Sequence, residues 1–311
     1  MIHTVYLVRA IGFIVIGVTF ASIIVETNIL TRFGVLTKGI CRISNLSRGS
    51  VLALLACIMS STGGKSMLAE FYKRGEVDRT ETTLAIVMST FPVVLGESLF
   101  RIHAPIAVAL LGPAVGGVYV LLTLFAAFIQ TLGALIASRV LLPNRACAIG
   151  GADRSEDRSI ALDWQTIKRG ARQAYPILRK IVPILIVSML AIEFLLSLGA
   201  GIYIAQAANP ILNLLGLPGD VIYVLIAQFI HFTAGYATVH TLLLNGVVTD
   251  KQAILTLLVG SMVVITMIYV KYSFSMYVSL FGKFGVTITA IHYASSMIAK
   301  VITILLVVMW Y

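Results

Sequence analysis

Several apolar runs in this chain are long enough to cross a lipid bilayer, and they constrain its fold more than any other feature. The run 4–26 and the final run 286–310 each exceed the roughly 20 residues that a membrane-spanning helix requires. Hydrophobic residues make up 59% of the sequence and charged residues 12%, with a mean hydropathy of +0.99. Because a segment in lipid must satisfy its own backbone hydrogen bonds, the sequence predicts an all-α, polytopic membrane protein.

Two of the apolar runs are interrupted by small polar residues, and the interruptions correspond in a faint internal repeat. The run 51–72 contains Ser60–Ser66, and the run 221–244 contains His231–Thr238. With a shift of 171 positions, identical residues are found for Leu54, Ala56, Thr62, Gly64, Gly75, Val77 and Leu84. Paired, glycine-broken apolar segments in two related halves are the best sequence indication of a transporter's binding site. We therefore expect a site at the two interruptions.

The repeat predicts two membrane halves, residues 1–142 and 181–311, joined by a cytoplasmic linker at 143–180 that includes an amphipathic segment. Each half is expected to contain about three membrane helices and one helical hairpin. In the first half an apolar helix from about Thr82 to Phe100 follows the broken run, with an expected kink at Pro92 and Gly96.

The distribution of Lys and Arg indicates how the broken runs lie in the membrane, since these residues gather in cytoplasmic loops. If both runs are re-entrant hairpins, 18 of these residues lie inside and three outside. If both runs cross the membrane, the better orientation gives 14 inside and seven outside. The first arrangement is favoured, and its odd number of crossings inverts the second half relative to the first. Spanning runs stay the alternative, because two arms made from one such run are short.

The segments that follow the first broken run resemble a known family. The sequence LGESLFRIHAP at 95–105, the Leu-Leu-Gly at 110–112 and the charged turn at 73–79 are similar to the Gate, or nucleoside-recognition, domain. This domain occurs in spore maturation proteins A and B, in the membrane part of ferrous iron transporter B and, distantly, in concentrative nucleoside transporters. The resemblance covers 51–140 and 212–311, and it implies an inverted-repeat membrane protein whose hairpins meet near the bilayer midplane. It names no substrate.

The side chains at the two interruptions can donate hydrogen bonds, and none is a carboxylate that would coordinate a cation. The N-termini of half-helices at a hairpin tip also favour anionic groups. The sequence therefore predicts a site for a small polar or anionic solute, with no metal and no cofactor. Its candidate residues are Ser61, Thr62, Gly64, Lys65, His231, Thr233, Gly235 and Tyr236. For each of them, close helix packing or satisfaction of backbone groups is the structural alternative.

Charged residues within apolar runs add further candidates, because ionisable groups at membrane depth are costly. Glu97 precedes Arg101 by four positions, and a local ion pair is the favoured interpretation. Glu193 and Lys300 are expected at similar depth, so we predict that they pair in the protein interior, with other partners as the alternative. In this part of the chain the repeat has a shift of 170 positions, and Gln130 then corresponds to Lys300, which makes that position polar in both halves.

A solute transporter or channel is the function that these features favour. A non-transporting assembly or scaffold protein and a divalent-metal transporter are the alternatives. An enzyme is not favoured, because no nucleophile has a base at a fixed spacing. The net charge of +10 describes membrane topology and does not indicate nucleic-acid binding. We expect a multi-pass protein of the plasma membrane whose partners are lipid and a small molecule or ion, with a homo-oligomer left open.

Overall fold

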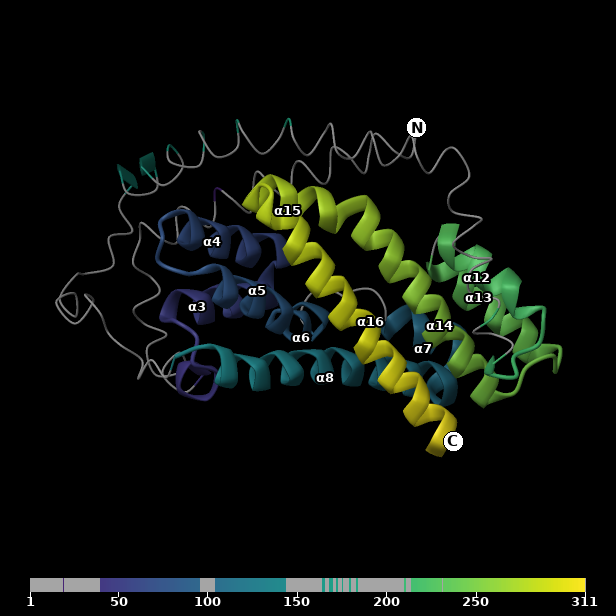
Figure 1. The fold of residues 1–311 in the computed structure, drawn as a ribbon. Helices are drawn as coiled ribbons and strands as arrows, with labels where there is room; N and C mark the ends of the chain where they lie inside the picture. The colour runs from purple at the N-terminus through teal and green to yellow at the C-terminus, as the bar shows by residue number, and fades with distance from the viewer. Residues whose placement is uncertain are drawn as a thin grey trace. The chain divides into compact units, whose positions relative to one another are not determined.

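The computed structural model describes residues 40–95, 104–143, 214–230 and 232–310, together with isolated helical positions at 19, 164–165, 168–169, 172, 175, 179, 183 and 210. Every element in the described ranges is a helix, and none is a strand (Figure 1). The all-α prediction is therefore confirmed for this part of the chain. Three of the helical stretches are long and apolar enough to cross a membrane: Leu110–Leu141, Asp250–Phe281 and Phe284–Met309.

The outer face of helix α8 (Val118–Leu141) carries a continuous stripe of exposed apolar side chains. Successive members of this stripe are three or four residues apart, so they lie on one side of the helix. They are Leu121, Phe125, Phe128, Leu132, Ile136 and Val140. A stripe of this length on a helix able to span a bilayer is expected where the protein faces lipid.

The first broken run folds back on itself at Ser60. Helix α3 (Arg48–Met59) ends and helix α4 (Ser61–Lys73) begins on either side of this residue, which has extended backbone angles (φ −153°, ψ 116°). The Ser60 hydroxyl caps α4 by accepting a hydrogen bond from the Gly63 N–H at 3.1 Å. A Cβ atom on Gly64 would lie only 2.5 Å from the backbone oxygen of Ala53. Gly64 therefore allows the two arms to pack in direct backbone contact.

The second broken run forms the corresponding pair, helix α12 (Val221–Ile230) and helix α13 (Phe232–Leu244). A Cβ atom on Gly235 would lie 1.9 Å from the Cγ atom of Gln228. On the other side of the same side chain, a Cβ on Gly260 of helix α14 (Asp250–Ile268) would lie 1.4 Å from its Oε1 atom. The two glycines thus form a slot that holds Gln228 against α13 and α14.

The C-terminal ends of the two hairpins are capped in the same way. Gly75 (φ 75°) and Gly246 (φ 67°) have left-handed backbone angles, which glycine adopts without strain. The Gly75 N–H donates to the Tyr72 carbonyl, and the Gly246 N–H donates to the Leu243 carbonyl, each at 3.0 Å. These bonds are displaced by the same 171 positions that relate the sequences, so the repeat is present in the local backbone structure.

The repeat also extends beyond the positions that are identical in sequence. Asp78 caps helix α5 (Arg79–Met88), and Thr249 caps α14 at the corresponding place. Before the hairpins, Asn45 (φ 55°) and Gly216 (φ 64°) share a left-handed conformation. Different residues therefore build the same turn and the same helix start in both halves.

The helix predicted from Thr82 to Phe100 is interrupted just before Pro92, one of the two positions where a kink is predicted. Helix α5 ends at Met88, and a short helix α6 (Thr90–Val93) follows after Ser89. Pro92 has no N–H to donate to the carbonyl of Met88, four residues earlier, and that carbonyl accepts a hydrogen bond from the Thr131 hydroxyl at 3.2 Å instead. The break therefore lies before Pro92, and Gly96 lies outside the described residues.

The remaining helices end at glycines with left-handed angles. Helix α7 (Ala104–Gly112) ends at Gly112 (φ 73°), and the π-helix η3 (Pro113–Gly117) leads into α8. After α14, the π-helix η6 (Tyr269–Ser273) continues into helix α15 (Phe274–Phe281), which ends before Gly282 (φ 64°). Helix α16 (Phe284–Trp310) completes the described chain.

The chain forms two compact units, and each draws on both halves of the sequence. Unit 1 comprises Met1–Glu97, Gln130–Val187 and Met276–His292, and unit 2 comprises Ser98–Ile129, Ser188–Ser275 and Tyr293–Tyr311. In unit 1, the carboxylate of Glu81 is fully buried and accepts hydrogen bonds from the Ser47 N–H and the Ser50 hydroxyl, both at 2.7 Å. This carboxylate fastens α5 to the positive N-terminal end of α3.

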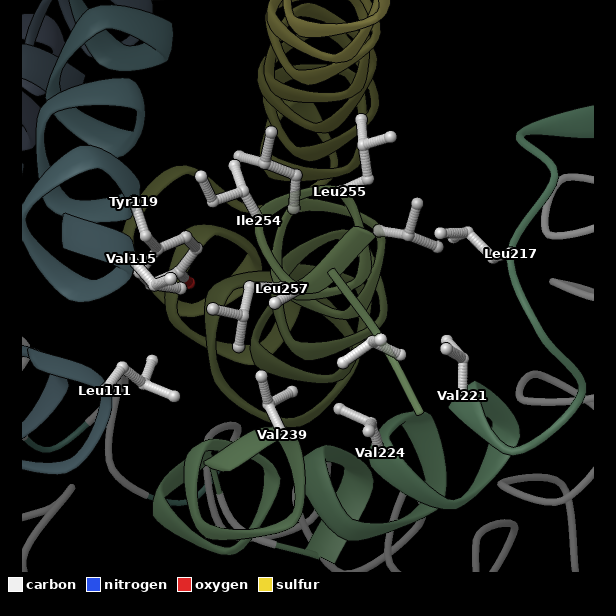
Figure 2. Packing of buried hydrophobic residues seen from close by; sticks show 14 of the residues in the cluster. Leu111, Val115, Tyr119, Leu217, Val221, Val224, Val239, Ile254, Leu255 and Leu257 are labelled. Carbon is white, nitrogen blue, oxygen red and sulfur yellow. The ribbon is translucent and has the colours of Figure 1, made fainter. Parts of the chain in front are cut away.

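Unit 2 has one large apolar core (Figure 2). Leu111, Val115 and Tyr119 approach it from α7, η3 and α8, while Ile254 and Leu257 come from α14. The hairpin contributes Val221, Val224 and Val239 to the same core. Burial of these side chains fixes the hairpin against α14, which positions Gln228 and the two glycines around it.

Candidate functional site

Helix α16 carries a face of polar residues along a length that is otherwise apolar. Its members are three or four positions apart and therefore lie on one side of the helix: Thr289, His292, Ser296, Lys300 and Thr303. The last four are buried, with exposed fractions of 7% or less. This spacing is visible in the sequence, although of these residues Lys300 alone is a predicted site residue.

His292 is the centre of a hydrogen-bond chain in unit 1. Its Nδ1 atom lies 2.9 Å from the Tyr277 hydroxyl, and its Nε2 atom lies 2.9 Å from the Thr90 hydroxyl. The Thr90 hydroxyl donates its one proton to the Val87 carbonyl at 2.8 Å. It therefore accepts from an Nε2–H group of His292. In the neutral imidazole the ring proton then lies on Nε2, and Nδ1 accepts from the Tyr277 hydroxyl.

Lys65 of α4 reaches the same place. Its side chain is 8% exposed, and its Nζ atom lies 5.4 Å from the centroid of the Tyr277 ring. An ammonium group in this position is attracted by the negative face of the ring. The structure thus places Lys65 inside unit 1, against the residue that is hydrogen-bonded to His292.

A further amide approaches from α8. The Nε2 atom of Gln130 donates to the backbone carbonyl of His292 at 3.4 Å. Helices α4, α6, α8 and α15 therefore each bring one polar side chain to the His292 segment of α16. We call Lys65, Thr90, Gln130, Tyr277 and His292 the His292 cluster. It contains one lysine and no carboxylate.

In unit 2 the polar face of α16 meets α14 and η6. The Tyr269 hydroxyl lies 3.1 Å from the Ser296 hydroxyl, and the Thr266 hydroxyl lies 2.9 Å from that of Tyr293. Lys300, one turn beyond Ser296, is 5% exposed. No carboxylate within the described ranges pairs with it. Its predicted partner Glu193 lies outside those ranges, so that pair stays a prediction.

The other predicted site residues have varied positions. Ser61 and Thr62 are half-buried in the first turn of α4, while Gly64 and Gly235 lie at the close contacts within the hairpins. Tyr236 is 1% exposed and belongs to the apolar core of unit 2.

The Tyr236 ring packs edge-on against Tyr119 and Phe232, with centroid distances of 5.7 Å in both pairs. Thr233 lies in α13, and nothing is described of its side chain. His231 and Glu97 lie outside the described residues. Of the predicted set, Lys65 belongs to the His292 cluster.

Gln228 was not singled out by our sequence analysis. Its side chain is 3% exposed, and its Oε1 atom has no hydrogen-bond partner in the described part of the chain. The corresponding residue in unit 1 is Cys57, whose Sγ atom would lie 2.3 Å from a Cβ on Gly64. Both units therefore place a side chain from the first arm over a glycine of the second.

Within the described ranges, His, Cys, Asp and Glu side chains form no group of three that could hold a metal ion.

Comparison with known proteins finds relatives that match nearly the full length of the chain. The uncharacterized protein MJ0880 of Methanocaldococcus jannaschii is 39% identical over 306 residues, which cover 98% of each chain. The uncharacterized protein MJ0871 of the same organism is 25% identical over 96% of this chain and 92% of its own length. A third archaeal protein, MJ1556, is 25% identical over 82% of this chain and 80% of its own. No family model matches the chain, and no solved structure matches it.

Proposed function

This chain belongs to the family of the uncharacterized protein MJ0880, and we propose that it is a multi-pass membrane transporter or channel for a small polar or anionic solute. The observation that carries the proposal is the His292 cluster. Lys65 and His292 are buried, and His292 and its neighbours Gln130 and Tyr277 lie in helical stretches that are apolar and of membrane-spanning length. Ionisable side chains are costly in such surroundings, and they commonly mark the path of a solute or ion.

The chemistry of the cluster favours an anion or a polar acceptor over a metal cation. Lys65 contributes an ammonium group, which can donate hydrogen bonds to a solute, and the cluster contains no carboxylate. A site for a divalent cation would need carboxylate or carbonyl oxygens instead. The Gate-domain resemblance of the sequence is consistent with this proposal and supplies no substrate.

We further propose that both broken runs are re-entrant hairpins in an inverted repeat. Their arms contain 12 and 13 residues in the first run and 10 and 13 in the second. At ~1.5 Å per residue, each arm is about 15–20 Å long, whereas the hydrocarbon core is ~30 Å thick. The two arms of each run fold back on each other. Short arms of this kind fit a hairpin that enters the membrane and returns to the same side.

Labelling of single cysteines tests this topology. Glu76→Cys and Thr249→Cys are made in a background without the native cysteines and are treated in intact cells with a thiol reagent that does not cross membranes. We expect only the second to react, because the charge distribution places the turn at 73–79 inside. After permeabilisation both should react, which is the control for accessibility. Reaction of Glu76→Cys in intact cells contradicts the inverted arrangement.

Solute flux into liposomes that contain the purified protein tests the transport proposal. The probes are radiolabelled chloride, sulfate, inorganic phosphate, a nucleoside and Fe²⁺. We expect flux of an anion or the nucleoside, lost in Lys65→Met and retained in Lys65→Arg. Lys283→Met, which changes an exposed lysine, is the matched control and should behave as the wild type.

Each other outcome points to a different function. Folded protein without flux of any probe supports a scaffold role. Flux of Fe²⁺ alone, unchanged in Lys65→Met, supports a metal transporter. Recovery of a chemically altered probe would indicate an enzyme.

A further inference from the structure

We propose that His292 is a proton-binding site, and that a proton bound there accompanies the solute that binds at Lys65. This inference rests on the proposed transport function and adds the coupling ion to it. Its basis is the chain of contacts from Lys65 through Tyr277 to His292 and Thr90, which lies within unit 1.

With a neutral imidazole, each of these hydrogen bonds has one donor and one acceptor. The Thr90 hydroxyl donates to Val87 and accepts from Nε2–H, while the Tyr277 hydroxyl donates to Nδ1. The group that can take up a further proton is thus the lone pair of Nδ1. This lone pair already accepts a hydrogen bond from the Tyr277 hydroxyl. A proton arriving from water binds Nδ1 only if the Tyr277 hydroxyl turns to accept a bond from the new N–H group.

The same bonds make protonation a change between two discrete states. Tyr277 is fully buried, so turning its hydroxyl requires a new acceptor for the released O–H group. A buried donor left without an acceptor costs free energy. Binding a proton therefore rearranges the contact between α15 and α16. The proton itself is taken up and released unchanged, and no covalent bond other than N–H forms or breaks.

Lys65 links this proton to the solute. Its ammonium lies over the Tyr277 ring, so a second positive charge on His292 is repelled across one side chain. An anion bound beside Lys65 cancels that repulsion and favours uptake of the proton. By linkage, the proton in turn favours binding of the anion.

Other titratable groups face the His292 cluster from the packed helices. Tyr277 comes from α15, Lys65 comes from α4, and the thiol of Cys57 in α3 lies against Gly64, next to Lys65. The residues that α6 and α8 contribute, Thr90 and Gln130, do not titrate. Histidine is the side chain of this set whose ordinary titration range includes neutral pH.

Proton movement measured together with solute flux tests the inference. Liposomes containing the protein are loaded with a pH-sensitive dye and given chloride or sulfate outside, with label in parallel samples. We expect anion uptake to acidify the interior, and uptake to rise by about tenfold when the outside is acidified by one pH unit. In His292→Gln, which keeps one donor and one acceptor but cannot titrate, both effects should disappear while the protein remains folded.

Matched variants separate coupling from folding. His240→Gln changes a histidine of α13 and should retain acidification. Tyr277→Phe removes the hydroxyl but keeps the ring beneath Lys65, so it should weaken the pH dependence of anion uptake. Unfolding midpoints of all variants are measured in detergent.

Anion flux without acidification overturns the inference and leaves the transport proposal standing. The same holds for acidification that persists in His292→Gln. Absence of flux for every probe overturns the transport proposal, and the inference with it.

Discussion

The two hairpins have the same backbone but carry different chemistry. Gly75 and Gly246 end them with equivalent hydrogen bonds, and Gly64 and Gly235 lie at equivalent close contacts. Against these glycines, however, unit 1 places the thiol of Cys57 and unit 2 the amide of Gln228.

The residue that follows Gly64 in α4 also differs from the residue that follows Gly235 in α13. Lys65 lies over the ring of Tyr277, whereas the equivalent Tyr236 packs among aromatic rings. The comparison shows that the repeated residues specify where the chain turns, and the residues that differ specify what each unit can bind. Unit 1 has a lysine over a tyrosine ring at its hairpin, and unit 2 has packed aromatic rings there.

The largest difference between equivalent positions is expected at Lys300 and Gln130. If Lys300 is paired with Glu193, Lys300→Met leaves a buried carboxylate alone and should cost about 3 kcal/mol of unfolding free energy. Gln130→Met removes a neutral amide and should cost about 1 kcal/mol. Unfolding in mixed micelles with increasing SDS measures both. The double variant Lys300→Met with Glu193→Leu should recover most of the loss, and a double variant as unstable as Lys300→Met shows that the pair does not exist.

The glycine of the first hairpin should be intolerant of any side chain. In Gly64→Ala, the new Cβ meets the backbone oxygen of Ala53 at 2.5 Å and the backbone nitrogen of Cys57 at 2.7 Å. Neither atom moves without shifting α3 against α4, so we expect a loss of about 2–3 kcal/mol. Adding Cys57→Ala should not restore stability in the same unfolding assay. Full restoration would show that the thiol, and not the backbone, is the obstacle.

The second unit should behave differently, because its obstacle is a side chain. In Gly260→Ala, the new Cβ would lie 1.4 Å from Oε1 of Gln228, and no backbone atom is among its nearest neighbours. We expect a loss of about 1–2 kcal/mol that Gln228→Ala recovers in the double variant. A double variant that remains as unstable as Gly260→Ala would contradict the slot that the structure shows around Gln228.

The smallest losses of stability are expected for the two helix caps, and they should be equal in the two units. Asp78→Ala and Thr249→Ala each remove a side chain that accepts a hydrogen bond from a backbone N–H at the start of a helix. Each should cost about 1 kcal/mol. Circular dichroism during thermal unfolding in detergent measures the pair. Clearly unequal shifts in the unfolding midpoint would show that the two equivalent caps do not contribute equally to stability.

The sequence by itself determined the helical membrane character, the two interruptions and the turns that end the hairpins. These features depend on local properties: the length of an apolar run, the missing Cβ of Gly75 and Gly246, and the missing N–H of a proline. The same local reasoning placed the kink of the helix after the first hairpin at Pro92 and Gly96. The break lies at Ser89. Pro92 has no N–H to donate to the Met88 carbonyl, and this carbonyl instead accepts a hydrogen bond from Thr131, a residue of another helix.

Only the tertiary structure decided which polar side chains meet. Thr90 and His292 are 202 positions apart and come within 2.9 Å only when α6 packs beside α16. A sequence pattern can show that His292, Ser296 and Lys300 share one face of a helix, but it cannot rank the helices against which that face packs. Hydrogen bonds are made over less than about 3.5 Å, so the partners of each polar group depend on packing distances that no spacing along the chain contains.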